Sequence, residues 1–231
     1  MALCLLIIVA LSVAIGCIPK ADLHLILCDR HTPARDIFYR YYTQVAEYGP
    51  YILAILILLF GRIGDAIMAI AGFSLSSLIT HIIKNIIQAP RPLTWFSTNA
   101  PDIALPLTDG VQMNFWKSFP SGHTTAFFAI AMILSLLITK KLSIKNYPLS
   151  IIVQVLLVIL ATLGAYSRIY LSQHFAEDVL AGMIIGTMAT LLCAMVLSRW
   201  EDKKWYNYRL LIKKVPQFVC PQPIYRLFLA A

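Results

Sequence analysis

The sequence predicts an all-α membrane protein, a polytopic bundle of about six transmembrane helices in a single domain that spans residues 1–231. Of these residues, 59% are hydrophobic and only 13% are charged, whereas a soluble domain carries roughly 25% charged residues. The mean hydropathy is +0.75. The apolar residues form long blocks, and the chain is long enough for about six spans of ~20 residues each.

The apolar blocks predict the individual spans. They cover residues 1–18, roughly 48–60, 66–87, 124–138, 149–165 and 179–197. The first block ends near Gly16-Cys17, so a cleaved signal peptide or a lipoprotein signal is an alternative. Because the block lacks a basic region at its start, we favour a retained span.

Two of the blocks have features of their own. The second is short, and we expect it to extend back through Tyr41 and Val45, which buries Glu47 near an interface and places Pro50 at a kink. The last block has small residues at intervals of four, a pattern that favours close packing of helices. These residues are Gly182, Gly186, Thr190 and Ala194.

Two polar segments connect the blocks. Residues 19–49 contain basic residues and the tyrosine-rich cluster 39–42, which predicts an interfacial segment with an amphipathic helix. His24 and His31 lie there without an evident partner. Residues 92–119 form an outer loop with Trp95 and Trp116 as interface anchors.

Basic residues predict the orientation, because cytoplasmic loops are enriched in Lys and Arg. With six spans and both termini inside, the inner side holds eleven basic residues, including the basic tail 199–231: Arg62, Lys140, Lys141, Lys145, Arg199, Lys203, Lys204, Arg209, Lys213, Lys214 and Arg226. The outer side holds eight: Lys20, Arg30, Arg35, Arg40, Lys84, Arg91, Lys117 and Arg168. All polar motifs described below then lie on the external side.

Charge and cysteine content narrow the function further. The net charge is +8, but the basic residues are dispersed over loops, and no basic and aromatic surface suggests nucleic acid binding. The five cysteines show no CxxC spacing and are interpreted as small apolar residues rather than as a metal site or a set of disulfides.

His174 and Asp178 form the first candidate pair. Four residues apart on a helix, they share one face, so the carboxylate can accept a hydrogen bond from one ring nitrogen and leave the other free to attack. The alternative is a buried polar pair that stabilises the start of a helix. From this pair alone, the two interpretations are evenly balanced.

The second candidate is Pro120-Ser-Gly-His123, which directly precedes an apolar block. Ser121 suits a helix N-cap, Gly122 permits close approach of a ligand, and the helix start favours an anion. His123 is placed to protonate a departing oxygen. Simple capping, with His123 at the interface, explains the motif equally well when it stands alone.

The third candidate is a set of cations, Lys84, Arg91 and Arg168. Charged residues in a membrane-type sequence are costly and mark functional sites. Guanidinium groups bind phosphoryl oxygens through two bonds, and an ammonium adds point charge. Interfacial snorkelling explains any one of them, but three cations flanking two histidines favour a phosphate site.

Together these residues read Lys-x6-Arg-Pro, Pro-Ser-Gly-His and Ser-Arg-x5-His-x3-Asp. The sequence thereby resembles the type 2 phosphatidic acid phosphatase (PAP2) superfamily, which includes membrane lipid phosphatases, bacterial acid phosphatases and vanadium-dependent haloperoxidases. The three motifs match that family's signature without a substitution. The signature covers residues 84–178, and the resemblance implies a PAP2-like helical core.

The resemblance also implies a division of labour. His174 attacks phosphorus and forms a phosphohistidine, Asp178 orients it, and His123 protonates the leaving group. Phosphate is held by five residues: Lys84, Arg91, Ser121, Gly122 and Arg168. Water then hydrolyses the phosphoenzyme, and neither a metal nor another cofactor is required.

We therefore expect a phosphatase that acts on a phosphorylated membrane lipid in a bacterial cytoplasmic (inner) membrane, with its site on the periplasmic side. Candidate substrates are undecaprenyl diphosphate, lipid A, phosphatidic acid and phosphatidylglycerol phosphate. A lipid phosphotransferase that uses the same site and a non-catalytic lipid carrier or scaffold of the same fold remain alternatives. Haloperoxidase activity is disfavoured, because those relatives are soluble.

Overall fold

The computed structural model describes residues 2–29, 31–142 and 147–211, with the side chains of 140–142 and 147 left out. Several expectations therefore lie outside the described residues: the part of the basic tail after residue 211, the side chains of Lys140, Lys141 and Lys145, and Cys220. The four described cysteines, Cys4, Cys17, Cys28 and Cys193, are free.

The described residues form helices and no strand, which confirms the all-α prediction. In chain order the helices are α1 (Ala2–Cys17), α2 (Lys20–Cys28), α3 (Pro33–Tyr42), α4 (Val45–Phe60), α5 (Ile63–Ile87), α6 (Pro92–Asn99), α7 (Gly122–Leu142), α8 (Tyr147–Tyr170) and α9 (Ala176–Leu197), followed by the 3-10 turn η1 (Ser198–Trp200).

Five of the described segments are long and apolar enough to cross a membrane: Pro33–Phe60, Ile63–Asn99, Gly122–Thr139, Pro148–Tyr170 and Ala176–Trp200. The apolar helix α1 has 16 residues and is shorter, so the count of six spans stays a prediction. Helix α4 extends the second block back to Val45 and contains Pro50, whereas Tyr41, which we expected to continue it, lies in the separate helix α3. The polar segment that follows α1 forms the two short helices α2 and α3.

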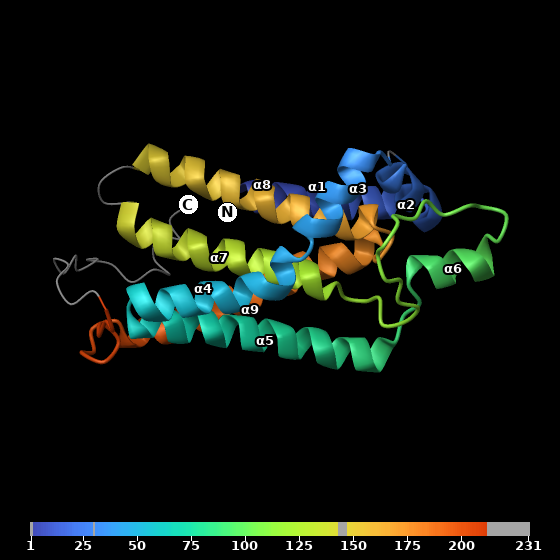
Figure 1. Cartoon of the computed structure of the whole chain (residues 1–231). Helices are drawn as coiled ribbons and strands as arrows, with labels where there is room; N and C mark the ends of the chain where they lie inside the picture. The colour runs from blue at the N-terminus through green and yellow to red at the C-terminus, as the bar shows by residue number, and fades with distance from the viewer. Residues whose placement is uncertain (1, 30, 143–146, 212–231) are drawn as a thin grey trace.

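The long helices lie side by side along one axis, and the short ones gather at one end (Figure 1). Helix α9 packs against both α5 and α7, and α7 packs against α8. Helices α2, α3 and α6 lie at the end where α5 finishes and α7 begins, whereas residues 200–211 lie at the opposite end.

The small-residue stripe of α9 allows this close packing, as predicted. A Cβ atom at Gly186 would lie 2.3 Å from the carbonyl oxygen of Thr125, and one at Gly182 would lie 2.6 Å from that of Ser121. Thr190 and Ala194 continue the stripe and are buried. Because only glycine leaves this space, the first turns of α7 lie directly on α9.

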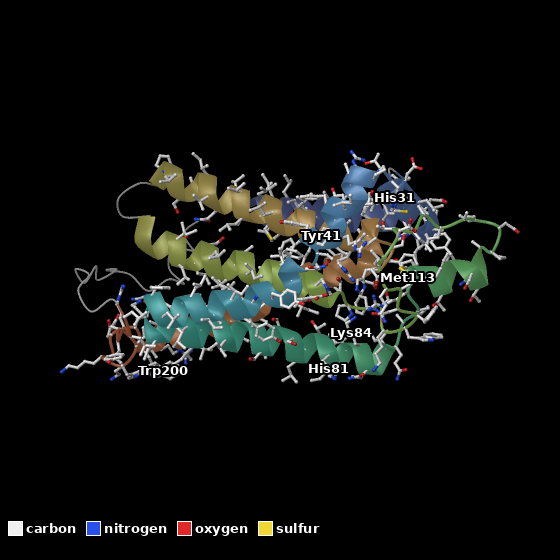
Figure 2. All side chains as sticks on the ribbon, viewed as in Figure 1. His31, Tyr41, His81, Lys84, Met113 and Trp200 are labelled. Carbon is white, nitrogen blue, oxygen red and sulfur yellow. The ribbon has the colours of Figure 1, made fainter. Side chains whose placement is uncertain are left out.

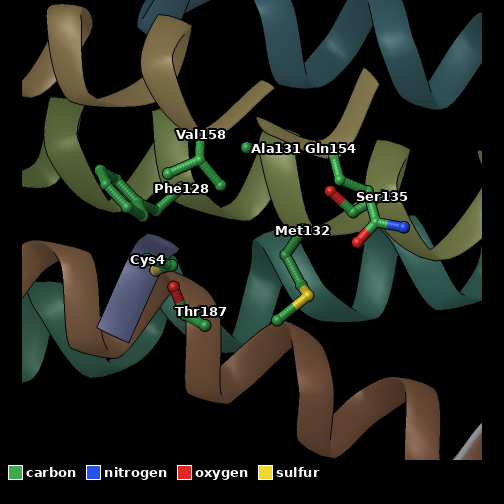
Figure 3. A pocket seen from close by; sticks show the side chains of 8 residues that line it. All are labelled: Cys4, Phe128, Ala131, Met132, Ser135, Gln154, Val158 and Thr187. Atoms are coloured by element: carbon green, nitrogen blue, oxygen red, sulfur yellow. The ribbon is translucent and has the colours of Figure 1, made fainter. Parts of the chain in front are cut away.

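The surface is as apolar as a lipid-facing surface requires. Ile152 on α8 is 63% exposed and Tyr51 on α4 is 73% exposed, and many other large apolar side chains of the long helices are exposed as well. In water such a surface would be an aggregation liability. Between α1, α7, α8 and α9 lies a cavity of about 30 Å³, lined by Cys4, Phe128 and Gln154 among others (Figure 3). It has room for roughly one water molecule and is too small for a substrate.

A cluster of polar contacts stabilises the end of the bundle that bears residues 200–211. Arg62 pairs with Asp65 (Nε–Oδ2 2.8 Å), and Tyr206, 1% exposed, packs its ring on Gly64 and donates to Asp65. The backbone amide of Gly64 donates to the carbonyl of Tyr206 at 3.0 Å. Residues that follow α9 are thereby fixed to the start of α5.

Candidate active site

The three sequence motifs meet at the end of the bundle that carries α2, α3 and α6. Lys84 lies in the last turn of α5, and Arg91 caps α6. Arg168 lies in the last turn of α8, and Asp178 lies in the first turn of α9. Figure 2 shows Lys84 and Met113 at this end of the molecule and Trp200 at the other.

His174 and Asp178 are a buried pair. The Nδ1 atom of His174 lies 3.3 Å from Oδ2 of Asp178, and the side chains are 2% and 4% exposed. Because the carboxylate lies on the Nδ1 side, the ring presents Nε2 as the nitrogen free for chemistry. The turn from α8 that positions His174 is closed by its amide, which donates to the carbonyl of Arg168 at 3.1 Å.

Asp178 is itself held by two further donors. Its Oδ2 accepts from Ser118 Oγ at 2.5 Å and from the backbone amide of Phe175 at 2.9 Å. Its backbone carbonyl accepts from the amide of Ser121 at 2.9 Å. Ser121 in turn caps α7, because its Oγ accepts from the amide of Thr124 at 3.4 Å. Asp178 therefore connects the Pro-Ser-Gly-His motif to the Ser-Arg-x5-His-x3-Asp motif.

Lys84 and Arg91, the cations of the Lys-x6-Arg-Pro motif, are fixed by backbone carbonyls of the loop before α7. Lys84 Nζ donates to the carbonyl of Lys117 at 2.6 Å, and Arg91 Nε donates to that of Trp116 at 3.1 Å. Arg91 also donates from a terminal nitrogen to the side-chain oxygen of Gln173 at 2.8 Å. Neutral acceptors orient these side chains without cancelling their charge.

Arg168 is 6% exposed and lies deepest of the three cations. One terminal nitrogen donates to Thr43 Oγ1 at 2.8 Å, while its buried Nε lacks a hydrogen-bond partner among the described residues. A buried donor without a partner is costly. An oxyanion bound here would satisfy it.

The pKa of the His174 ring is held well below its ordinary value. Burial is the main cause, and the positive charges of Arg91, Arg168 and Lys84 add to it. The ring is therefore neutral at neutral pH, which is the form a nucleophile requires. The same shift shows that all three cations act electrostatically on His174.

His123 lies in the first turn of α7 with its Nε2 atom 3.1 Å from Oε1 of Glu47. The expectation that Glu47 is buried is wrong: its side chain is 50% exposed. Helix α4 begins two residues before Glu47 and directs it toward α7, so the carboxylate pairs with the imidazole instead of packing in the interface.

The three histidines outside the motifs lie in other surroundings. His81 is exposed on α5 and points away from the motifs (Figure 2). His31 pairs with Asp36 at 2.9 Å and stacks on Tyr170. His24 is 1% exposed, and burial lowers its pKa to about 4. Hence both histidines of the 19–49 segment take part in packing that sequence alone did not reveal.

The flanking residues Trp116 and Lys117 do not enter the cation cluster with their side chains. Trp116 is 58% exposed, as an interface anchor would be. The Lys117 ammonium donates to Asn85 Oδ1 at 2.7 Å. Their backbone carbonyls, rather than their side chains, contact the motif residues.

Among the side chains that touch the motifs and were not identified from the sequence are Thr43, Glu47 (placed in the interface instead), Ser118 and Gln173. Two of them had a signal in the sequence, since Ser118 lies two residues before Pro120 and Gln173 directly precedes His174. Thr43 and Glu47 lie far from the motifs along the chain and had none.

The part of the chain that the structure describes contains no group of three or more His, Cys, Asp and Glu side chains arranged as metal ligands. The donor set around His174 is cationic instead, and such a set suits an anion rather than a metal ion. The expectation that no metal or cofactor is required stays a prediction.

Fold and side-chain arrangement define a helical membrane protein that gathers a histidine, an aspartate and three cations at one end of its bundle. The model of the PAP2 superfamily matches residues 65–202, and the chain belongs to this superfamily.

Curated relatives have modest similarity to the chain. It is 30% identical to lipid phosphate phosphatase 2 of Arabidopsis thaliana, over 54% of this chain and 49% of that protein. It is 27% identical to phosphatidylglycerophosphatase B of Bacillus subtilis (55% and 56%). A third relative is dolichyldiphosphatase 1 of Dictyostelium discoideum, at 28% identity (57% and 52%). The chain spans about half the length of the curated relatives it matches.

Two solved structures share the fold. One is the transmembrane PAP2 type phosphatidylglycerolphosphate phosphatase of Bacillus subtilis, with a TM-score of 0.64 and 20% identity over 88% of this chain and 98% of that one. The other is LpxE of Aquifex aeolicus, with a TM-score of 0.58 and 24% identity over 78% and 97%. With five described segments that are apolar and long enough to span a membrane, the chain is an integral membrane protein.

Proposed function

We propose that this protein is a lipid phosphate phosphatase, a hydrolase that removes phosphate from a phosphorylated membrane lipid through a phosphohistidine on His174. Membership of the PAP2 superfamily and the phosphatase names of its relatives support this activity. The substrate is a phosphomonoester or diphosphate lipid, of which undecaprenyl diphosphate, lipid A, phosphatidic acid and phosphatidylglycerol phosphate are the candidates.

One observation carries the proposal: three cations surround a neutral histidine, and none of them forms an ion pair with a described carboxylate. Lys84, Arg91 and Arg168 all act on His174, yet their hydrogen bonds go to carbonyl, amide and hydroxyl oxygens. Arg168 is buried and Lys84 and Arg91 are half-buried, and such cations without a carboxylate partner are costly for a membrane protein. A phosphoryl group that binds between them would compensate that cost and would lie next to the His174 ring.

The chemistry follows from this arrangement. Nε2 of His174 attacks phosphorus and forms an N–P bond while the bond to the leaving oxygen breaks. His123 donates a proton to that oxygen, and Asp178 stabilises the positive charge that develops on His174. The cations, with Ser121 and the Gly122 amide at the start of α7, hold the three phosphoryl oxygens. Water then attacks phosphorus, breaks the N–P bond and releases inorganic phosphate.

The position of the site at one end of the bundle suits a membrane substrate. A headgroup can reach the cations from the interface while its chains stay among the helices. The basic residues of the loops favour the outer side for this end, which in a bacterium is the periplasmic side of the cytoplasmic membrane. The dispersed basic residues offer nucleic acid no binding surface.

The test is a phosphate-release assay. Protein purified in detergent should release inorganic phosphate from a panel of lipid phosphates in excess EDTA, and vanadate should inhibit it. His174→Ala should abolish release, because no phosphohistidine can form. Turnover near the wild-type rate in this variant would refute the nucleophile assignment. Transfer of the phosphate to a second lipid would reveal a phosphotransferase, and absence of release from the whole panel would favour a carrier or scaffold.

A further inference from the structure

A cavity of about 480 Å³ opens between α4, α5 and α7, next to the motif residues. Its lining reaches from Gly122 and His123 at the start of α7 to Ala54 on α4 and Ile70 on α5. The lining of α5 extends from Thr80 to Ile70, which is about 15 Å at the rise of an α-helix. The cavity therefore runs from the level of the phosphate site toward the middle of the bundle, where α4 and α5 lie side by side (Figure 1).

The cavity lies on the leaving-group side of the site. His123, which protonates the leaving oxygen in the proposed function, is part of its lining. His174 and the three cations are not part of the lining. An oxygen that accepts a proton from His123 is thus bonded to a group that enters this cavity. The inference rests on the proposed function in this respect.

The surroundings of His174 and the lining of the cavity differ in charge. Around His174 lie the charges of Lys84, Arg91 and Arg168, together with the Asp178 carboxylate 3.3 Å from the ring. The lining of the cavity contains no lysine or arginine; its one carboxylate is Glu47, 3.1 Å from His123 Nε2. The three cations also act on His123 from outside the lining, but the one charged side chain in the lining beside the leaving group is the Glu47 carboxylate.

We propose that Glu47 is a specificity-determining residue, which makes the protein select phosphomonoester lipids over diphosphate lipids. When a monoester reacts, the P–O bond that breaks leaves a neutral alcohol, which the Glu47 carboxylate does not repel. When a diphosphate reacts at its terminal phosphorus, the leaving group is a second phosphate. That anion must lie at His123, beside Glu47 and without a cation in the cavity to neutralise it.

The expected discrimination follows from Coulomb's law. Two like charges about 5 Å apart, one of them half-exposed, repel enough in a medium between water and protein to change a rate by roughly tenfold. The penalty applies to the ground state and the transition state of the diphosphate alone. Loss of the His123 contact, by contrast, slows both substrates alike, so the ratio of the two rates isolates the charge effect.

A matched pair of substrates tests the proposal. Farnesyl monophosphate and farnesyl diphosphate share their chain and differ by one phosphate. We measure kcat/KM for each substrate from phosphate release by the full-length protein in detergent. Only initial rates are used, because the diphosphate is converted to the monophosphate, which is itself a substrate. We expect the wild type to prefer the monophosphate by at least roughly tenfold and Glu47→Gln to reduce this preference by roughly tenfold.

Glu177→Gln is the control, since it removes one carboxylate that pairs with Lys20 at 3.8 Å outside the cavity. It should leave the preference unchanged. A wild type that hydrolyses both substrates within threefold of each other overturns the proposal, as does an unchanged ratio in active Glu47→Gln. If this variant cannot be purified, the wild-type ratio of kcat/KM for the monophosphate to kcat/KM for the diphosphate decides whether the proposal stands. Failure of the wild type on both substrates and on the lipid panel would instead refute the phosphatase function itself.

Discussion

Replacing Ser118 with alanine removes one hydroxyl from the centre of the site. Ser118 is 0% exposed and donates its hydroxyl to Oδ2 of Asp178 at 2.5 Å. Alanine fills nearly the same volume, so the change removes the hydrogen bond without opening a large cavity. Ser118 does not carry out a chemical step; it positions Asp178, which in turn orients His174.

The structure sets the size of the effect. A hydrogen bond to a charged group contributes about 1.5–3 kcal/mol. Asp178 Oδ2 keeps the Phe175 amide at 2.9 Å and His174 Nδ1 at 3.3 Å, so the lower end of this range applies. Since 1.36 kcal/mol corresponds to tenfold in rate, we expect kcat to fall about tenfold. KM should change little, because Ser118 does not contact the phosphate-binding side chains through its hydroxyl.

The assay is steady-state phosphate release from one lipid phosphate, with a thermal unfolding scan of each variant to exclude misfolding. Ser97→Ala is the control, because Ser97 is an exposed serine on α6 whose hydroxyl bonds only its own helix, at the carbonyl of Thr94. A kcat within twofold of the wild type in Ser118→Ala would refute the view that this hydrogen bond orients the catalytic pair. An equal loss in the control would show that the effect is unspecific.

Three further predictions concern packing, protonation and charge geometry. Gly186→Ala should lower the melting temperature and the activity, because its Cβ would lie 2.3 Å from the Thr125 carbonyl oxygen, whereas Gly16→Ala, with open space around it, should do neither. The pKa of His24 is lowered to about 4 in the folded protein, so the unfolded chain binds the proton more tightly. His24 should therefore contribute about 3 kcal/mol of stability that is present above pH 6.5 and lost as the pH falls to about 4. The melting temperature of His24→Phe should fall less than that of the wild type over this pH range. An equal fall in both proteins would contradict the assignment. Arg91→Lys should reduce kcat/KM at least roughly tenfold, since an ammonium cannot reproduce two parallel bonds to a phosphoryl group; wild-type kinetics would show that only its charge matters.

Much of the fold could be predicted because hydrophobicity is a local property of the chain. The blocks around 66–87 and 179–197 correspond to α5 and α9, and the four small residues of α9 do lie in close contact with neighbouring helices. The first 49 residues were harder. His24 and His31 had no visible partner in the sequence. The contact of His24 with Ser172 and the stacking of His31 on Tyr170 depend on how α2 and α3 pack against the end of α8, whereas Asp36, the ion-pair partner of His31, lies only five residues along the chain.

The motif residues were identifiable from the sequence because charged and polar side chains at these spacings are unusual in an otherwise apolar chain. A histidine and an aspartate four residues apart share a helix face in any fold. Ser118 and Gln173 lie close to the motifs along the chain, yet they were not distinguishable from ordinary loop residues. Their hydrogen bonds to Asp178 and Arg91 form only when the loop before α7 folds over α9.

By itself, the sequence determined that the chain is a helical membrane protein and which side chains we propose to hold and attack a phosphoryl group. Tertiary structure decided how charge is distributed around that group. Thr43 and Glu47 are more than 30 residues from any motif, and they contact Arg168 and His123 because α3 and α4 return to the end of the bundle where α7 begins. Contacts between residues so distant in the chain depend on helix packing, which no local pattern encodes. For that reason the Glu47 carboxylate beside His123 became visible only in the folded protein.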